Sequence, residues 1–300
     1  MTTSSPLIVV ALGGNAISPP HGDLSIGAER TVIAHAISEL VLVASGGARL
    51  LVVHGNGPQV GRLLATEGLG DPENLDVHVA QTQGELGYLV AEELDAHLGG
   101  RAAVAVVTRV LVDAEDPAFA EPTKPVGAVL SERPQGVPAM RTPDGRGWRR
   151  VVASPRPIAV VEQEAIGVLL AAHHVIAGGG GGVTLAGSLA LRHPQPAVVD
   201  KDWVAALLAI AFDARQLLFV TDVPVAFDRF GEAGQQPISM MTTDEALGRL
   251  AQGVFAPGSM APKVQSAVQF VAACGRPAMI TTIGSITAAL RGEAGTRICP

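Results

Sequence analysis

Aromatic residues, cysteine and positive charge are all scarce in this chain of 300 residues. Phe, Trp and Tyr make up 3% of it, so the core must be built from Val, Leu, Ile and Ala, the usual filling of packed helix and sheet layers. Cys274 and Cys299 alone cannot form a disulfide framework. A formal net charge of −7 argues against nonspecific binding of nucleic acid, which requires a basic surface. Any anion-binding site must therefore be local.

Signals for membranes and secretion are also missing. No apolar run reaches the roughly 18 residues of a membrane span. The first residues, MTTSSP, have neither the basic nor the apolar region of a signal peptide. We therefore expect a cytoplasmic protein without a membrane partner. With 48% hydrophobic and 16% charged residues, the chain can bury a large core, in one domain or in two closely joined lobes.

The first stretch with a possible functional pattern is the apolar run of residues 7–12, which is followed directly by Gly13, Gly14 and Asn15. An uninterrupted apolar run fits a strand buried on both faces of a parallel sheet. Ligands of open α/β sheets bind at the carboxyl ends of such strands. The two glycines can bring backbone N–H groups close to an anion, and Asn15 adds a side-chain donor. A tight turn without a ligand is the alternative interpretation.

A second strand shows the same pattern. The apolar residues 50–53 run into the sequence HGNGPQVG, in which Gly55 and Asn56 form a turn. Pro58 suits the first turn of a following helix, because its missing N–H has no partner there in any case. We interpret this turn as a second contribution to a binding site at the sheet edge.

A third strand, expected at residues 175–177, enters five consecutive glycines, residues 178–182. Such a run is costly to order and contributes no side-chain packing. We interpret it as backbone, including Gly179 and Gly180, in close contact with phosphate. Neither a dinucleotide fingerprint nor a phosphate-binding loop ending in Gly-Lys-Ser/Thr accompanies it.

Helices and strands alternate through the first third of the chain. Ser25 is placed to cap a helix that ends at Gly46, a second helix is expected at residues 77–94, and a strand at residues 103–108. This β-α-β-α-β order favours a doubly wound α/β fold with a parallel sheet. Glycines inside the second helix, Gly84 and Gly87, indicate close approach by another backbone, a ligand or a second subunit.

Residues 113–157 interrupt this order with many prolines and few apolar runs. The turn sequence TPDG and a returning strand at residues 148–152 predict a small subdomain that contains a hairpin. Within it Lys124 stands between Pro122-Thr123 and Pro125, and the prolines stiffen the backbone that presents it. A solvated surface lysine is the alternative interpretation.

Two further lysines stand at the starts of expected helices. Lys201 lies in VVDKD, before an apolar helix, and Lys263 lies in GSMAPKV, at the start of a helix that continues to Cys274. The flanking Asp200 and Asp202 suit a helix cap and dipole, whereas a cation is disfavoured at that end. Lys201 is therefore placed as a residue facing an anion would be.

Together these motifs resemble the carbamate kinases of the amino-acid kinase superfamily, over nearly the whole chain and in the family's order. The resemblance rests on VVALGGNA, VHGNGPQVG, PTKP, GWRRVVASP, IAGGGGGV, VVDKD, TDV and GSMAPKV. It implies a three-layer αβα sandwich with a mainly parallel open sheet and a small protruding hairpin subdomain. Two positions depart from the family pattern: Ala261 replaces a glycine, and Trp203 replaces a smaller aliphatic residue.

The resemblance also implies how the chain is divided. Residues 1–300 would form a single amino-acid kinase domain. Its N-terminal lobe, residues 1–196, would bind carbamoyl phosphate and carry the subdomain at about residues 113–157. Its C-terminal lobe, residues 197–300, would bind the nucleotide.

The implied reaction is reversible phosphoryl transfer between ATP and carbamate, usually running toward ATP. Such a reaction requires positioning and positive charge rather than a covalent nucleophile. Many amino-acid kinases carry a lysine on the first strand; the position is Ala11 here, so we expect Lys124 to supply that charge from a subdomain that closes over bound ligand.

The resemblance also implies which residues form the site. The residues implied are, for catalysis, Lys124, Lys201, Lys263 and Asp202; for the substrate, Gly13, Gly14, Asn15, Gly55, Asn56, Gly179 and Gly180; and for the nucleotide, Lys201, Thr221, Asp222, Val223, Gly258, Ser259, Met260 and Lys263.

The resemblance implies Mg²⁺ as the cofactor, held chiefly by nucleotide phosphates and water rather than by protein ligands, and a homodimer. Arginine catabolism is one setting that uses this chemistry; purine-derived carbamoyl breakdown and the reverse reaction are others. Two alternatives remain. A related kinase would act on another small carboxylate or acyl phosphate, such as that of acetylglutamate, and a noncatalytic sensor would bind carbamoyl phosphate or nucleotide without turnover.

Overall fold

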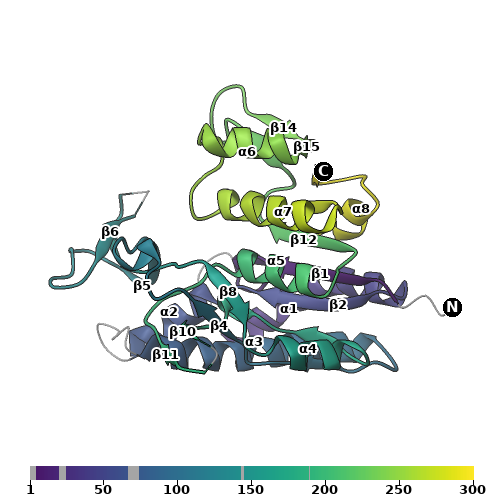
Figure 1. The fold of residues 1–300 in the computed structure, drawn as a ribbon, viewed down its shortest axis with the longest axis horizontal. Coiled ribbons are helices and arrows are strands. Elements are labelled where there is room, and N and C mark those ends of the chain that lie inside the picture. The colour runs from purple at the N-terminus through teal and green to yellow at the C-terminus, as the bar shows by residue number, and fades with distance from the viewer. Residues whose placement is uncertain (1–4, 20–24, 67–73, 143–144, 189) are drawn as a thin grey trace.

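A mainly parallel sheet of eight strands forms the centre of the computed structural model, which describes residues 5–19, 25–66, 74–142, 145–188 and 190–300 (Figure 1). The strand order is β15-β17-β16-β12-β1-β2-β9-β3, and only the β16–β17 pair is antiparallel. The strands are β1 (Leu7–Leu12), β2 (Arg49–His54), β3 (Ala103–Ala105), β9 (His174–Ile176), β12 (Gln216–Thr221), β15 (Met240–Thr242), β16 (Ala278–Thr282) and β17 (Thr296–Cys299). The predicted open, mainly parallel sheet is confirmed.

The central strand β1 is buried along its whole length, as its apolar run predicts. Side chains of a strand alternate between the two faces of the sheet. Accordingly Leu7, Val9 and Ala11 belong to the core on one face, while Ile8, Val10 and Leu12 belong to the core on the other. An apolar run without alternation is therefore the pattern that this position requires.

Helices cover both faces of the sheet and complete the three layers of the predicted sandwich. The helices that supply the core on the Val9 face are α4 (Gln163–Leu170), α5 (Lys201–Ala211), α6 (Thr243–Ala251) and α7 (Met260–Cys274). Those on the Val10 face are α1 (Ile26–Ser45), α3 (Leu75–His97) and α8 (Ile286–Leu290). None of the helices in the described ranges is long and apolar enough to cross a lipid bilayer.

Local signals place several helix features correctly. Ser25 caps α1, since its hydroxyl accepts a hydrogen bond of 3.4 Å from the N–H of Ala28. Gly87 of α3 lies against the sheet: a Cβ there would stand 2.8 Å from the Cβ of Ala105, so close approach explains this glycine. Gly84 has nothing within 4 Å of its own would-be Cβ.

The prediction of a strand at residues 103–108 is wrong in its length. β3 ends at Ala105, and the chain turns at Thr108 into β4, which belongs to another sheet. A side chain contributes to this turn: the amide of Gln83 accepts from the N–H of Thr108 at 2.8 Å and donates to its carbonyl at 3.1 Å, and the same carbonyl accepts the N–H of Val183 from the second sheet at 2.9 Å. The second sheet has the order β11 (Arg192–Pro194), β10 (Val183–Gly187), β4 (Arg109–Val112) and β8 (Pro157–Val160), and it packs with α2 (Gly57–Thr66) around a third core cluster.

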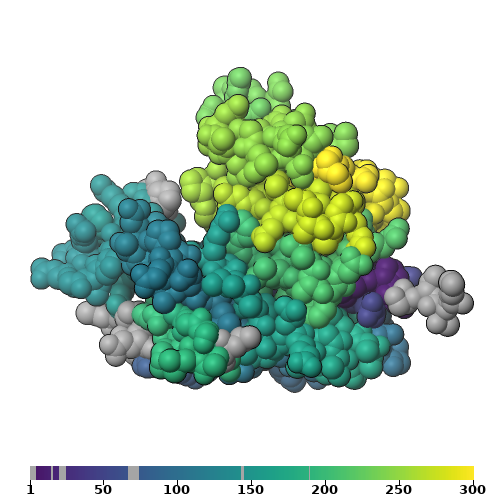
Figure 2. Space-filling model, in the orientation of Figure 1, coloured from purple at the N-terminus to yellow at the C-terminus, as the bar shows by residue number. Residues whose placement is uncertain are grey.

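The subdomain protrudes from the body as a small antiparallel sheet, which we call the arm (residues 124–152; Figures 1 and 2). Its strands are ordered β5-β7-β6, with β5 (Lys124–Leu130), β6 (Ala139–Arg141) and β7 (Trp148–Val152). The hairpin was predicted, but the third strand, β5, was not. Pro143 and Asp144 of the expected turn lie outside the described residues.

Smaller elements complete the chain. They are the short 3-10 helices η1 (Gly14–Ala16), η3 (Pro117–Phe119) and η4 (Gly179–Gly181), and the hairpin of β13 (Ala226–Asp228) and β14 (Gln236–Ile238). The arm and the elements around α6 both project from the body, and the surface is indented between them (Figure 2).

Candidate active site

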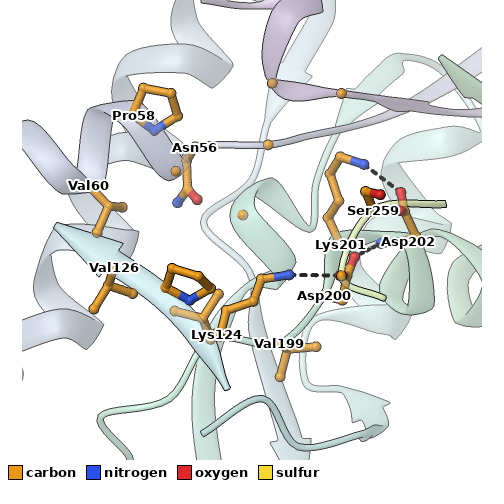
Figure 3. Close-up of a pocket in the computed structure, with 18 of the residues that line it drawn as sticks. Asn56, Pro58, Val60, Lys124, Val126, Val199, Asp200, Lys201, Asp202 and Ser259 are labelled. Carbon is orange, nitrogen blue, oxygen red and sulfur yellow. Dashed lines mark hydrogen bonds and ion pairs between the residues drawn. The ribbon is translucent and has the colours of Figure 1, made fainter. Parts of the chain in front are cut away.

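The carboxyl ends of the central strands open into a cavity of about 320 Å³, the main cavity (Figure 3). β1 has β2 on one side and β12 on the other, so the strand order reverses here, and such a switch point is where open α/β sheets bind ligands. The described residues that line it and carry the argument below are Gly13, Gly14, Gly55, Asn56, Pro58, Val60, Val79, Lys124, Pro125, Val126, Gly180, Val198, Val199, Asp200, Lys201, Asp202, Thr221, Asp222, Gly258, Ser259 and Lys263.

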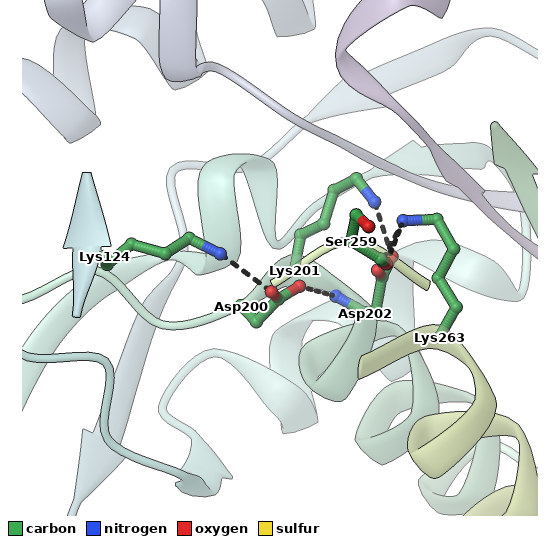
Figure 4. Close-up of polar contacts among 6 residues, drawn as sticks. All are labelled: Lys124, Asp200, Lys201, Asp202, Ser259 and Lys263. Carbon is green, nitrogen blue, oxygen red and sulfur yellow. Dashed lines mark hydrogen bonds and ion pairs between the residues drawn. The ribbon is translucent and has the colours of Figure 1, made fainter. Parts of the chain in front are cut away.

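Two lysines converge on one carboxylate at the cavity floor (Figure 4). Lys201 Nζ donates to Asp202 Oδ1 at 2.5 Å, and Lys263 Nζ donates to Asp202 Oδ2 at 3.0 Å. Lys201 is the first residue of α5, whereas Lys263 comes from the first turns of α7 and also donates to the Ser259 carbonyl at 3.2 Å. Two helix starts distant in sequence thus present their lysines to one point.

Burial and mutual charge set the ionisation of this cluster. Burial lowers the pKa of the Lys201 ammonium below its ordinary value, although the Asp202 charge opposes it. Burial acts on Lys263 in the same direction, but the Asp202 charge outweighs it and the pKa of Lys263 is raised. For Asp202, burial favours a higher pKa, but the two lysine charges outweigh it and bring the pKa to about 2. Asp202 is therefore ionised at neutral pH and holds both ammonium groups in place.

The arm supplies the third lysine. Lys124, the first residue of β5, lines the main cavity and donates to Asp200 Oδ2 at 2.8 Å. The prediction that the subdomain brings this lysine to the sheet edge is thus matched by its position. The solvated-surface interpretation is not, because the lysine side chain is only 26% exposed.

The glycine turns after β1 and β2 contribute less hydrogen bonding than expected. The N–H of Gly13 donates to Val220 O at 2.8 Å, and that of Gly55 donates to Leu12 O at 3.1 Å, so both are committed to the sheet. The expectation that these two N–H groups bind an anion is therefore corrected. Among the described contacts, the N–H of Gly14 donates to no backbone carbonyl, and Gly14 lines the main cavity. This N–H is therefore available to a ligand in the cavity.

Most of the glycine run is explained by crowding rather than by ligand contact. A Cβ on Gly179 would stand 2.5 Å from His54 Nε2, and one on Gly181 would overlap the Val199 carbonyl. Within the run, only Gly180 is among the described residues lining the main cavity. Gly179, predicted to bind substrate, is instead buried against His54 and is not among the described lining residues.

The two predicted asparagines have different outcomes. Asn56 is buried on the cavity wall, and its Nδ2 donates to Thr82 Oγ1 at 2.9 Å, which fixes its orientation. Asn15 lies in η1, but its side chain is outside the described residues.

A second cavity of about 160 Å³ adjoins the first and shares Thr221, Asp222 and Ser259 with it. Val223 and Met260, predicted to border the nucleotide, also line it, whereas Gly258 lines the main cavity. No sequence motif pointed to the remaining walls, which are largely apolar and come from short segments: Phe227, Phe230, Val254, Phe255 and Ala256. An apolar slot beside a cavity lined by three lysines suits the base of a nucleotide next to its phosphates.

Within the described residues, no cluster of three or more His, Cys, Asp or Glu side chains is arranged to hold a metal ion. Asp222 is the carboxylate at the boundary of the two cavities, and its residue is exposed. Asp202, by contrast, is occupied by two lysines.

An open α/β sheet with lysines at its switch point and an apolar slot beside them defines a phosphoryl-transfer class of protein. The sequence pattern of the amino acid kinase family matches residues 6–282. The chain therefore belongs to the amino acid kinase family.

Relatives within the family are more specific. A carbamate kinase of Lentilactobacillus hilgardii is 37% identical over 97% of this chain and 96% of its own length, and one of Halobacterium salinarum is 39% identical over 97% and 98%. A solved structure of carbamate kinase from Giardia lamblia bound to AMP-PNP superimposes with a TM-score of 0.88 at 32% identity, covering 99% of both chains.

Proposed function

We propose that this protein is a carbamate kinase, which transfers a phosphoryl group reversibly between carbamoyl phosphate and ADP. The observation that carries the proposal is the main cavity lined by three lysines, which joins the apolar second cavity through Thr221, Asp222 and Ser259. The acyl phosphate occupies the first cavity and the nucleotide the second. The AMP-PNP bound by the Giardia relative supports the nucleotide part of this assignment.

The lysines perform the chemistry by stabilising charge. Lys201 and Lys263, held 2.5 Å and 3.0 Å from Asp202, face the transferring phosphoryl group and its leaving oxygen. Their ammonium groups are already oriented by Asp202, so little reorganisation is needed as charge develops in the transition state. Lys124 adds a third positive charge from the arm, and no covalent nucleophile is required.

The lining of the main cavity favours an acceptor without a further charged group. Its wall around Asn56 is apolar, formed by Pro58, Val60 and Val126 (Figure 3). Lys124, Lys201 and Lys263 are the cationic members of the described lining, and all three are assigned to the phosphoryl group. A substrate such as acetylglutamate carries a further carboxylate, which would face this apolar wall without a cation. Carbamate carries no carboxylate besides the group that is phosphorylated.

A panel of acyl phosphates tests the substrate. Purified enzyme with Mg-ADP and carbamoyl phosphate, acetyl phosphate or acetylglutamyl phosphate is expected to form ATP fastest from carbamoyl phosphate. Its kcat/KM should be at least about a hundredfold above that for acetylglutamyl phosphate, because the further carboxylate of that substrate would lie unpaired against the apolar wall. Faster ATP formation from one of the others would make the related-kinase alternative correct. Binding without turnover of any of them would make the protein a sensor.

Magnesium is the proposed cofactor. It would arrive with the nucleotide and be held mainly by phosphate oxygens and water, as this ion prefers. The exposed Asp222, between the two cavities, is the carboxylate whose position suits that water shell. When bound, the ion would neutralise charge on the phosphates being transferred.

We also propose a homodimer in the cytoplasm. An exposed stripe runs along α3 at helical spacing, with Val77 and Tyr88 at its ends, 50% and 52% exposed, and Gln81 and Gly84 between them. Large apolar side chains around an open glycine suit close packing against another helix. Arginine catabolism is the proposed source of the carbamoyl phosphate.

A further inference from the structure

The carboxylate of Asp200 serves two partners at once (Figure 4). Its Oδ1 accepts a hydrogen bond of 3.1 Å from the N–H of Asp202, which caps α5. Its Oδ2 accepts the 2.8 Å bond from Lys124 Nζ. Because the first bond fixes the carboxylate on the end of a helix, the second oxygen lies at a defined point on the cavity wall.

A helix cap alone does not require a charge. Asn and Ser serve this position about as well as Asp, so capping does not explain why the residue is ionisable. The side chains of Lys124 and Asp200 are only 26% and 14% exposed, and both line the main cavity. A charged hydrogen bond that is partly withdrawn from water is stronger than one on an open surface.

The chain that leaves the arm after Val152 contacts the same segment of the body. The N–H of Val198 donates to Ala153 O at 3.0 Å. The guanidinium of Arg156 lies over the ring of Trp203, with 4.1 Å between Cζ and the ring centroid, a cation–π contact. Lys124 at the start of the arm and the residues just after the arm therefore contact residues 198–203, and Asp200 lies in the middle of this segment.

We propose that Asp200 is a positioning residue that holds Lys124 of the arm at the edge of the main cavity. Its significance for the reaction rests on the proposed function, because it acts through the charge that Lys124 delivers. The pairing itself is testable without turnover. Asp200→Asn keeps an oxygen for the N–H of Asp202 and removes the charge, and Asp200→Ser is a second neutral cap.

Amide hydrogen exchange of the ligand-free protein tests the pairing. In Asp200→Asn we expect the amides of Lys124 and of residues 126–130 to exchange about fivefold faster, the size of effect that a partly exposed ion pair produces, while those of β1 are unchanged. Lys124→Met should give the same increase, and the double variant no more than either alone. Unchanged exchange in the arm, or additive effects in the double variant, would overturn the proposal.

Kinetics test the consequence for catalysis. Both Asp200→Asn and Asp200→Ser should lower kcat about tenfold with the KM for Mg-ADP unchanged, because a misplaced charge loses transition-state stabilisation. In the Lys124→Met background, Asp200→Asn should have no further effect on kcat. Turnover within twofold of an active wild type would refute the positioning role. A wild type without carbamate kinase activity would refute the proposed function instead, and the exchange experiment would still decide the pairing.

Discussion

Lys201 is the residue on which the proposed chemistry depends most. It stands at a helix start, where the dipole disfavours a cation, and its ammonium is held by Asp202 on the cavity floor. Losing one preorganised donor removes about 10²- to 10³-fold in rate. We therefore expect Lys201→Ala to lower kcat by about that factor while circular dichroism and melting show an intact fold. Activity within threefold of wild type would show that the lysine has another role.

The same lysine predicts a pH dependence. Because burial lowers the pKa of Lys201 below its ordinary 10.5, it loses its charge as pH rises through the lowered value. Lys263, whose pKa is raised, stays charged over that range. The alkaline fall of kcat is therefore expected below pH 10.5. Lys201→Arg, which remains protonated, should move the fall of its residual kcat to higher pH; an unmoved fall would assign it to another group.

Lys124 is the residue by which the arm takes part in the reaction. Lys124→Ala should lower kcat by about two orders of magnitude, about 2.7 kcal/mol of transition-state stabilisation, with a smaller change in Mg-ADP affinity. The control is Ala11→Lys in that background, which places a fixed lysine on β1. It should not restore kcat fully, because a fixed charge also binds the ground state. Normal turnover of Lys124→Ala would show that the arm has a structural role and takes no part in catalysis.

At the scale of elements, η4 and its flanking glycines offer a matched pair of substitutions. Gly180 and Gly182 have φ values of 62° and 80°, so an alanine is strained at either one. A Cβ on Gly180 would overlap the Asn56 side chain in the cavity, whereas one on Gly182 would overlap Val110 in the core. Both alanine variants should lower the melting temperature, but only Gly180→Ala should weaken carbamoyl phosphate binding, by about tenfold. Equal affinities in the two variants would make the run purely structural.

The elements also show how much of the structure could be predicted from the sequence. The strand and turn at residues 7–14 were predictable because a doubly buried strand and a glycine turn are local signals. That the N–H of Gly13 is committed to Val220 O was not, since the partner lies in β12, about two hundred residues later in the chain. The apolar slot was missed for a similar reason: Phe227, Phe230 and Phe255 come together only through tertiary packing.

At the scale of the whole molecule, the proposed dimer depends on the stripe of α3. A Cβ on Gly84 would meet nothing within 4 Å in the single chain, so Gly84→Glu should leave the monomer folded. If the stripe is the interface, the added charge should raise the dimer dissociation constant by at least about tenfold. Light scattering during gel filtration measures this. A dimer unaffected by the substitution would place the interface elsewhere, and a monomeric wild type would contradict the dimer itself.

The measurement that tests the central claim most directly is phosphorus NMR of the purified enzyme with carbamoyl phosphate and Mg-ADP. The three lysines that line the main cavity, next to the second cavity, predict direct transfer. The carbamoyl phosphate signal should therefore fall in step with the rise of the ATP γ-phosphate, with no more inorganic phosphate than in a sample without enzyme. Adding ATP and carbamate should drive the same signals in reverse. Enzyme-dependent release of inorganic phosphate without ATP, or no consumption at all, would contradict the account.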